Sequence, residues 1–406
     1  MNAATFISKR IFSLSKENLS STVMRIAVAS VALGIAIMLI SMAVVIGFKN
    51  QIKDKVIGFV APIHVQALNQ NESIEETPFL FDSVLDARLD KSFITEIHKT
   101  ANKAGIIKTD EEIQAVVLKG VDNDYNWSYI KSYLLDGDIP QYIENERSND
   151  IIISNIIAHK MSLGVGDDVR IWFVDHDLKA RGRKFIVKGI YETGLQECDE
   201  RYVYCDLNQI RRLNGWNNGE IGRLEIWVDK EASIDEYNQT IYYSIPTDLV
   251  SYSAMESYPQ IFDWLELQDM NVLIIIVLML LVAGITIISM LLIIILERTS
   301  TIGLLKAMGA SNGLVRSIFM KRSCRILLIG VAIGNIIGLA LCLIQKYTNV
   351  ITLSPESYYL SAVPIELDIW NILALNIGTM ILWVLMLLLP TMLINNIRPS
   401  KSIRFE

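Results

Sequence analysis

The sequence lacks the short motifs of three common enzyme classes. No Gly-x-x-x-x-Gly-Lys-Ser/Thr segment is present, so the chain has no P-loop with which to hydrolyse ATP. Its four histidines show neither the H-E-x-x-H motif nor another paired ligand spacing, which leaves a zinc enzyme without a ligand set. A G-x-S-x-G nucleophile elbow is also missing. We therefore expect a chain without catalytic residues that binds no metal or cofactor.

Charge is absent from four long apolar runs of the chain. Each run approaches or exceeds the ~20 residues that a helix needs to cross ~30 Å of hydrocarbon. The first run is longer than the ~7–15 apolar residues of a cleavable signal peptide, so we expect it to remain as an anchor. The sequence therefore predicts four transmembrane helices, at residues 26–48, 271–296, 326–345 and 369–394.

Lysine and arginine concentrate in three segments that flank these runs. Residues 1–25, 297–325 and 395–406 are each basic on balance, and the positive-inside rule places such flanks in the cytoplasm. The insert 49–270 and the short loop 346–368 are then extracytoplasmic. The insert carries 38 acidic and 23 basic residues, a net charge of −15. Because no basic surface concentrates on a folded domain, nucleic acid is excluded as a partner.

The long insert mixes strand and helix patterns, which predicts one α+β domain or a pair of them. Short runs rich in Val, Ile and aromatic residues are typical of strands. They lie at 113–118, 151–154, 169–174, 185–190, 202–205 and 224–228. Helical spacing appears in three groups, namely Leu85, Leu89, Phe93 and Ile97, then Ile156, Ile157 and Met161, then Ile210 and Leu213.

A few isolated residues allow two interpretations each. Cys198 and Cys205 either meet across a tight turn or point to opposite faces of one strand. Asn335 and Asn376 lie near the middle of two spans, where hydrogen bonding between helices is favoured over a polar transport pathway. The N-terminal stretch TFISKRIFSLSKEN suits a short helix in the membrane interface or a frayed tail.

The stretch ERTSTIGLLKAMGAS follows the second apolar run directly. Ile302, Leu305 and Met308 recur there at helical spacing, Gly309 can end that helix, and Ser311 can cap the next one. A second apolar face follows at Leu314, Val315, Ile318 and Phe319. We therefore predict two short helices joined by a glycine. By residue pattern alone, they suit a groove on a soluble partner and a lipid surface equally well.

This stretch resembles the coupling helix of the FtsX/MacB-like permeases. The matching residues are Glu297, Ile302, Gly303, Leu305, Lys306, Ala307, Met308, Gly309, Ala310 and Ser311. The ending LPTMLINNIRPSKSIRFE is similar to that family's ending at Pro390, Pro399, Ile403, Arg404 and Glu406. The resemblance implies that the segment docks into a separate ABC-type ATPase. ATP and Mg²⁺ would then be bound by that partner and not by this chain.

Within this family the chain is most similar to the permeases of the lipoprotein-releasing (Lol) system. The similar stretches include VALGIAIMLISMAVVIGFKNQIKDKVIGFVAPIHV, FDWLELQDMNVLIIIVLMLLVAGITIIS and TGLQECDERYVYCDLNQIRRLNG. The resemblance implies a bacterial inner-membrane complex with two ATPase subunits and a second permease, identical or homologous. Such a complex lifts lipoproteins from the outer leaflet, among membrane lipids, and passes them to a periplasmic carrier. The alternatives are an FtsX-like scaffold that relays ATPase motion to a periplasmic hydrolase and a MacB-like mechanotransmission exporter.

Two candidate sites follow for such a function. Apolar residues near the ends of the first two spans predict a V-shaped cargo site, formed by Met42, Val45, Ile46, Phe48, Phe262, Leu265 and Met270. The stretch DHDLKARGRKFIVK, residues 175–188, predicts a hairpin with Gly182 relieving its turn. In one Lol permease the corresponding hairpin grips the carrier. Here it lacks the expected prolines but carries Lys179, Arg181, Arg183 and Lys184, which either attract an acidic carrier or form a solvated tip.

Overall fold

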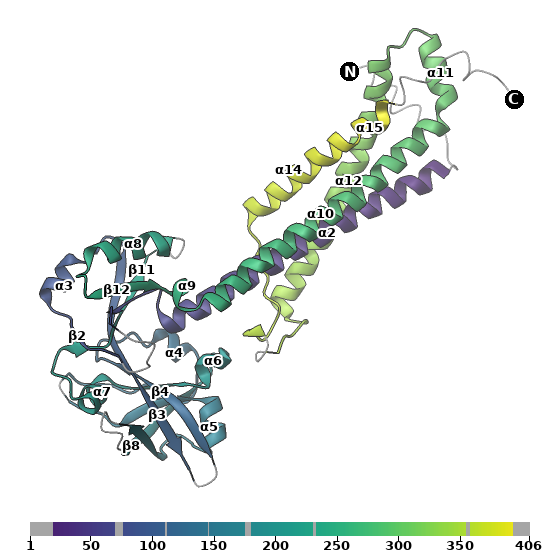
Figure 1. The fold of residues 1–406 in the computed structure, drawn as a ribbon. Coiled ribbons are helices and arrows are strands. Elements are labelled where there is room, and N and C mark those ends of the chain that lie inside the picture. The colour runs from purple at the N-terminus through teal and green to yellow at the C-terminus, as the bar shows by residue number, and fades with distance from the viewer. Residues whose placement is uncertain are drawn as a thin grey trace. The chain divides into compact units, whose positions relative to one another are not determined.

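In the described part of the chain, the computed structural model has four helices that are long and apolar enough to cross a membrane (Figure 1). They are α2 (Leu19–Val60), α10 (Pro259–Glu297), α12 (Asn312–Thr348) and α14 (Ile369–Met386), which the short α15 (Leu388–Thr391) follows. The structure describes residues 19–69, 76–109, 112–144, 146–174, 180–229, 233–354 and 358–392. The N-terminal segment before residue 19 and the tail after residue 392 lie outside these ranges.

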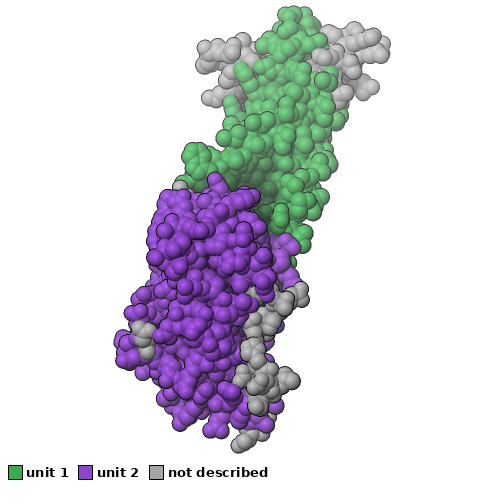
Figure 2. All heavy atoms as spheres, turned by 60° about the vertical axis from the view of Figure 1, so that its left-hand side comes forward, with its two compact units in different colours: residues 1–50, 264–352, 362–406 green, residues 51–263, 353–361 purple. Residues whose placement is uncertain are grey.

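The helices α2, α10 and α12 each contain one predicted apolar run, whereas the fourth run, 369–394, is divided between α14 and α15 and extends beyond the described residues. The first two helices continue well beyond their runs, to Val60 in α2 and back to Pro259 in α10. Charged residues end the charge-free runs there, but they do not end a helix, because Lys and Glu have good helix propensity and each Asp costs less than about 1 kcal/mol. The chain divides into two compact units, coloured separately in Figure 2. The bundle unit comprises residues 1–50, 264–352 and 362–406, and the sheet unit comprises residues 51–263 and 353–361.

In the bundle unit, α2 and α12 pack closely through a row of glycines. Gly330, Gly334 and Gly338 recur every fourth residue, which places them on one face of α12. A Cβ added to Gly334 would lie 2.6 Å from the carbonyl oxygen of Ala32 and 2.8 Å from the Cβ of Ile35. Small residues at such spacing allow the backbones of membrane helices to approach each other.

Polar side chains join α12 to α14. The amide Nδ2 of Asn335 donates to Oδ1 of Asn376 at 2.7 Å, and Nδ2 of Asn376 donates back to Oδ1 of Asn335 at 3.0 Å. The predicted hydrogen bonding between helices is therefore confirmed for both residues. The indole of Trp383 in α14 also donates to the carbonyl of Leu280 in α10, at 3.4 Å.

After α10 the chain forms one short helix, α11 (Thr299–Ala307), and then enters α12. The second short helix predicted for this region does not exist separately. Leu314, Val315, Ile318 and Phe319 lie in the first turns of α12, which runs unbroken to Thr348. The charged residues that separated this segment from the third apolar run interrupt its hydropathy but not its helical hydrogen bonding.

The sheet unit is built around a ten-stranded mixed sheet. Its order is β12-β1-β11-β3-β4-β9-β6-β8-β5, and β7 pairs with both β3 and β8. The strands are β1 (Ile63–Ala67), β3 (Ile94–Lys108), β4 (Ile113–Val121), β5 (Leu134–Gly137), β6 (Asp150–Ser154), β7 (Asp168–Val174), β8 (Ala180–Tyr191), β9 (Tyr202–Asp206), β11 (Arg223–Val228) and β12 (Leu249–Ser253). The strands β2 (Phe79–Leu80) and β10 (Glu220–Ile221) form a separate pair.

Among the described residues, seven shorter helices belong to the sheet unit. They are α3 (Ser83–Arg88), α4 (Ser128–Ser132), α5 (Asn155–Met161), α6 (Gln196–Asp199), α7 (Leu207–Asn214), α8 (Ile234–Ser244) and α9 (Ala254–Ser257). All six predicted strands are present, so the predicted α+β class is confirmed. The helix predicted through Phe93 and Ile97 is wrong, because α3 ends at Arg88 and Ile97 belongs to β3. A spacing of four fits a strand face as well as a helix face.

The two cysteines of the insert are both free and buried. Cys198 lies in α6 and Cys205 lies in β9, so they share neither a strand nor a turn. Burial, with Asp199 and Glu197 nearby, raises the pKa of the Cys198 thiol to about 12. Neither thiol carries a reactive thiolate at neutral pH.

Candidate functional site

The helix α11, between α10 and α12, has a narrow exposed strip. The two large side chains in this strip, Leu304 and Met308, are apolar. Ser300, Leu304 and Met308 are exposed and spaced four residues apart, so they share one face of the helix. Leu304 is 54% exposed and Met308 is 68% exposed. Ile302 and Gly303 are buried, and Leu305 packs partly against the core of the bundle unit. We call Ser300, Leu304 and Met308 the coupling strip.

The structure places the three residues of the predicted docking face on two different sides of the helix. Of Ile302, Leu305 and Met308, only Met308 belongs to the coupling strip, whereas the other two face the bundle. The sequence pattern did not single out Leu304, because α11 carries apolar residues both on its exposed strip and on the side that packs against the bundle. Of the other residues named for coupling, Glu297 and Gly309 are exposed and Lys306 is half-buried.

A glycine fixes the shape of this segment. The amide of Ala310 donates to the carbonyl of Leu305 at 3.0 Å, and that of Gly309 donates to the carbonyl of Lys306 at 3.0 Å. With a φ of 92° at Gly309, these bonds form a Schellman motif that closes α11. Ser311 then accepts a hydrogen bond from the amide of Leu314 and caps α12. The predicted roles of Gly309 and Ser311 as helix end and cap are confirmed.

The residues predicted for the cargo site lie where α2 and α10 pass each other. The rings of Phe48 and Trp264 meet edge to face, with centroids 5.5 Å apart. Nζ of Lys49 lies 2.6 Å from Oδ2 of Asp269. Leu265 is buried and Met270 is 54% exposed. The two helices therefore touch at this level, and Met270 faces outward from α10.

Among the other cargo candidates, Met42 and Val45 lie on α2 with part of their side chains exposed. Ile46 and Phe48 are also half-buried there. Phe262 belongs to the sheet unit, on the part of α10 that precedes Trp264. Of the four membrane helices, α10 buries the smallest share of its most apolar stretch.

The predicted hairpin is formed by β7 and β8, whose residues pair from Asp168 with Ile186 to Val174 with Ala180. Its tip, with Lys179, lies outside the described residues. Gly182 does not relieve the turn, because it is paired with Trp172 inside the strand. Alternation along β8 places Arg181 and Arg183 on one face and Lys184 on the other. Lys184 forms an ion pair with Asp168 at 2.7 Å.

The sheet unit also encloses charged residues that the sequence pattern did not single out. Nζ of Lys119 in β4 lies 2.8 Å from Oε1 of Glu225 in β11, and both side chains are buried. Rings of Phe59, Tyr125 and Tyr204 surround the ammonium at about 6 Å from their centroids. Burial alone would lower the pKa of Lys119, but Glu225, Tyr125 and Tyr202 together outweigh it and the pKa is raised. Charges alternate with apolar residues in β11, which is typical of a solvated face, and Lys119 is the single charged residue of β4, so no local pattern indicated the pair.

The chain matches two protein families over most of its length. Residues 25–242 match the MacB-like periplasmic core domain, and residues 273–399 match the FtsX-like permease C-terminal domain. The first match covers more than half of the chain. The chain therefore belongs to the MacB-like periplasmic core domain family, and its C-terminal part is that of an FtsX-like permease.

Individual relatives extend over almost the whole chain. It is 22% identical to the lipoprotein-releasing system transmembrane protein LolC of Buchnera aphidicola, over 96% of this chain and 95% of the relative. It is 20% identical to the LolE protein of Haemophilus influenzae, over 99% of each chain. Among solved structures, the periplasmic region of MacB from Actinobacillus actinomycetemcomitans covers 52% of this chain and 98% of its own, with 12% identity and a TM-score of 0.35.

Proposed function

We propose that this chain is a permease subunit of an ABC-type complex that releases lipoproteins from the bacterial inner membrane. The observation that carries the proposal is the similarity over 96% and 99% of the chain to proteins named for lipoprotein release. The similarity covers the insert as well as the spans.

The basic flanks give the orientation in this proposal. The segments before α2, between α10 and α12, and after α15 lie in the cytoplasm, and the sheet unit lies in the periplasm. The coupling strip then faces the cytoplasm. Leu304 and Met308 enter a groove of an ABC ATPase, because an exposed apolar pair at this spacing is the ordinary anchor of a helix in a groove.

The complex we propose has two ATPase subunits and two permease subunits, the second permease being identical or homologous. The ATPase subunits bind ATP and Mg²⁺, and this chain binds no cofactor of its own. Its role is mechanical. Each acyl CH₂ that leaves lipid costs about 0.8 kcal/mol, so extraction of a lipoprotein requires work that ATP hydrolysis supplies through α11.

In this proposal the cargo binds at the periplasmic ends of the membrane-spanning parts of α2 and α10. Acyl chains would lie against Val45 and Met270, which are both at least partly exposed there. The contact between Phe48 and Trp264 closes the space between the helices, so a V-shaped site requires them to separate during the cycle. The carrier would dock on the face of β8 that bears Arg181 and Arg183.

The test is purification of the complex from its native membranes with a tagged copy of this chain. Mass spectrometry should find an ABC ATPase and lipoproteins in the purified material. The variant L304D/M308D should lose the ATPase and stop lipoprotein release while it keeps the second permease. Y243D is the matched control, because Tyr243 in α8 is also an exposed apolar residue, at 84%. Unchanged release with L304D/M308D would overturn the proposed coupling, and lipoproteins absent from every active preparation would overturn the proposed cargo.

A further inference from the structure

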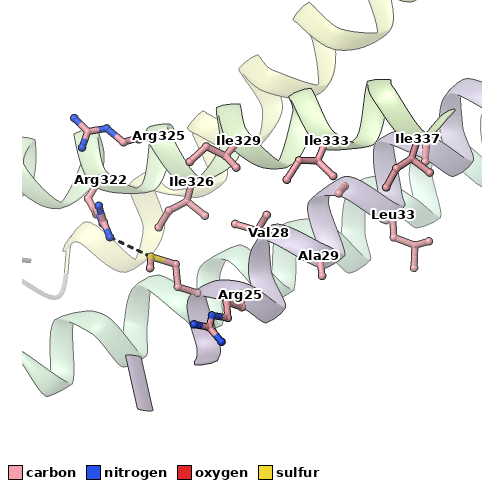
Figure 3. A pocket seen from close by; sticks show the side chains of 13 residues that line it. Arg25, Val28, Ala29, Leu33, Arg322, Arg325, Ile326, Ile329, Ile333 and Ile337 are labelled. Carbon is pink, nitrogen blue, oxygen red and sulfur yellow. Dashed lines mark hydrogen bonds between the residues drawn. The ribbon is translucent and has the colours of Figure 1, made fainter. Parts of the chain in front are cut away.

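A groove of about 620 Å³ runs along the surface of the bundle unit between α2 and α12 (Figure 3). Its walls are apolar over most of their length, with Val28, Ala29 and Leu33 on α2 and Ile329, Ile333 and Ile337 on α12. Arg25, Arg322 and Arg325 gather at one end, as Figure 3 shows. The volume falls within the ~300–1,000 Å³ of small-molecule sites.

The length of the groove corresponds to one leaflet of a bilayer. The lining residues extend from Met24 to Ala36 on α2 and from Arg322 to Ile337 on α12. At ~1.5 Å per residue these stretches are about 18 Å and about 22 Å long. Half of a ~30 Å hydrocarbon core is about 15 Å. An acyl chain in the groove would therefore reach from the interface to the middle of the membrane.

The charged end of the groove has the chemistry of an anion site. Among the described residues that line it, three are arginines and none is acidic. A guanidinium binds phosphate oxygens through two parallel hydrogen bonds, and it is more weakly hydrated than an ammonium. Nη2 of Arg322 donates to the sulfur of Met24 at 3.3 Å, which holds this side chain across the mouth of the groove (Figure 3).

We propose that this groove binds an anionic phospholipid, with one acyl chain between α2 and α12 and the phosphate on Arg25, Arg322 and Arg325. Basic sites between membrane helices at the cytoplasmic surface recognise such headgroups. The site goes beyond the proposed function, because it lies on the side of the basic flanks and hence in the leaflet opposite the cargo.

A second copy of this chain is a poorer occupant of the groove. A symmetric contact through this surface would place each arginine cluster against its own copy, since the same patch meets itself across a two-fold axis. Like charges brought together in this way repel each other, and the membrane interface screens them less than water does. A lipid phosphate instead brings the opposite charge.

The test uses the full chain with its partner subunits, reconstituted in nanodiscs of equal parts phosphatidylglycerol and phosphatidylcholine. After extraction into mild detergent, native mass spectrometry counts the lipids that remain bound. The wild type should retain phosphatidylglycerol in preference to phosphatidylcholine. R322Q/R325Q should lower its retention by about tenfold, because each basic side chain near the surface contributes to the attraction of anionic lipid. R316Q/K321Q removes the same charge from α12 outside the groove lining and should retain the lipid.

A second variant tests the apolar half of the site. I333W fills the groove from a position that is 39% exposed, so it should displace the acyl chain without disturbing the helix core. Equal retention of phosphatidylglycerol by the wild type, R322Q/R325Q and I333W would overturn the proposal. A photo-crosslinker at Ile329 that joins two permease chains and captures no lipid would also overturn it, because the groove would then be a contact between subunits.

Discussion

Leu304 and Leu305 are adjacent in the sequence, but they serve opposite sides of α11. Leu304 is 54% exposed on the coupling strip, whereas Leu305 packs against the core of the bundle unit. This difference follows from the ~100° that separates successive side chains on a helix. It predicts that the same substitution at the two positions has two different effects.

We expect L304D to uncouple the complex and to leave the bundle folded. A charge at this position stays in water in the free chain, but it would be buried in the groove of a partner. L305D places the charge against the protein's own core and should lower the stability of the bundle by several kcal/mol. ATPase retention and thermal unfolding, measured on both variants, separate the two effects. Equal stability of L304D and L305D would contradict the assignment of the two faces.

The reciprocal amide pair predicts a measurable coupling energy between α12 and α14. N335L and N376L each leave one amide without its partner, so each should destabilise the bundle, whereas N335L/N376L removes both amides and should cost less than the sum. Hydrogen bonds between membrane helices contribute about 0.6 kcal/mol on average and up to about 1.7 kcal/mol. A double-mutant cycle on unfolding in detergent measures this coupling. Additive effects would show that the two hydrogen bonds contribute nothing as a pair.

The glycine row predicts that one added methyl group separates two helices. G334A places a Cβ within 2.6 Å of the carbonyl oxygen of Ala32, and overpacking of this kind costs about 1–3 kcal/mol. G378A is the matched control, because a Cβ at Gly378 in α14 meets nothing within 4 Å. It should be neutral or stabilising by up to about 1 kcal/mol. Thermal unfolding of both variants gives the comparison, and a G334A protein as stable as G378A would refute the close contact.

The sheet unit should lose stability as the pH rises through the weakly acidic range. Burial raises the pKa of Asp199 from 3.8 to about 6, although Thr193 and Gly194 donate hydrogen bonds to its carboxylate. A pKa raised by folding means that the native state holds this proton more tightly than the unfolded state. Its contribution is therefore fully present below about pH 4 and is lost as the pH rises through 6.

D199N removes this titration and should flatten the change in stability between about pH 4 and about pH 6. Hydrogen exchange of the β9 amides in the full chain measures it. D136N is a suitable control, because Asp136 lies on an exposed part of β5. An unchanged slope in D199N would mean that other groups carry the pH dependence.

The proposed carrier site predicts that the two faces of the β7–β8 hairpin respond differently to charge reversal. R181E/R183E should weaken binding of the periplasmic carrier at low salt, because the two side chains share a face and exposed charges act strongly only at low ionic strength. K184E/K188E changes the opposite face by the same charge and should bind normally. Titrations with the carrier at two salt concentrations measure its affinity for the wild type and for both variants. Identical affinities of these three proteins would mean that the carrier binds elsewhere.

The sequence predicted the long elements well and the faces of the short ones poorly. The four spans follow from long apolar runs, and the six strands follow from segments rich in Val and Ile. Such segments are compatible with few other structures. Ile97 was assigned to a helix because its spacing from Phe93 fits both periods, and only the pairing of β3 with β4 and β11 decides between them. The outward direction of Leu304 and the buried pair of Lys119 and Glu225 depend on contacts between distant segments, which no local pattern contains.

The helix α12 begins at the Ser311 cap and continues without a break to the glycine row and beyond. Residues 311 and 334 are therefore about 35 Å apart along a single helix axis, at ~1.5 Å per residue. A stiff rod of this length does not absorb a displacement at one end by local bending. Because Gly334 lies against the backbone of α2, we expect a tilt of α12 imposed near Gly309 and Ser311 to move α2 as well. A force that the proposed ATPase partner applies at α11 would therefore reach the first span through α12.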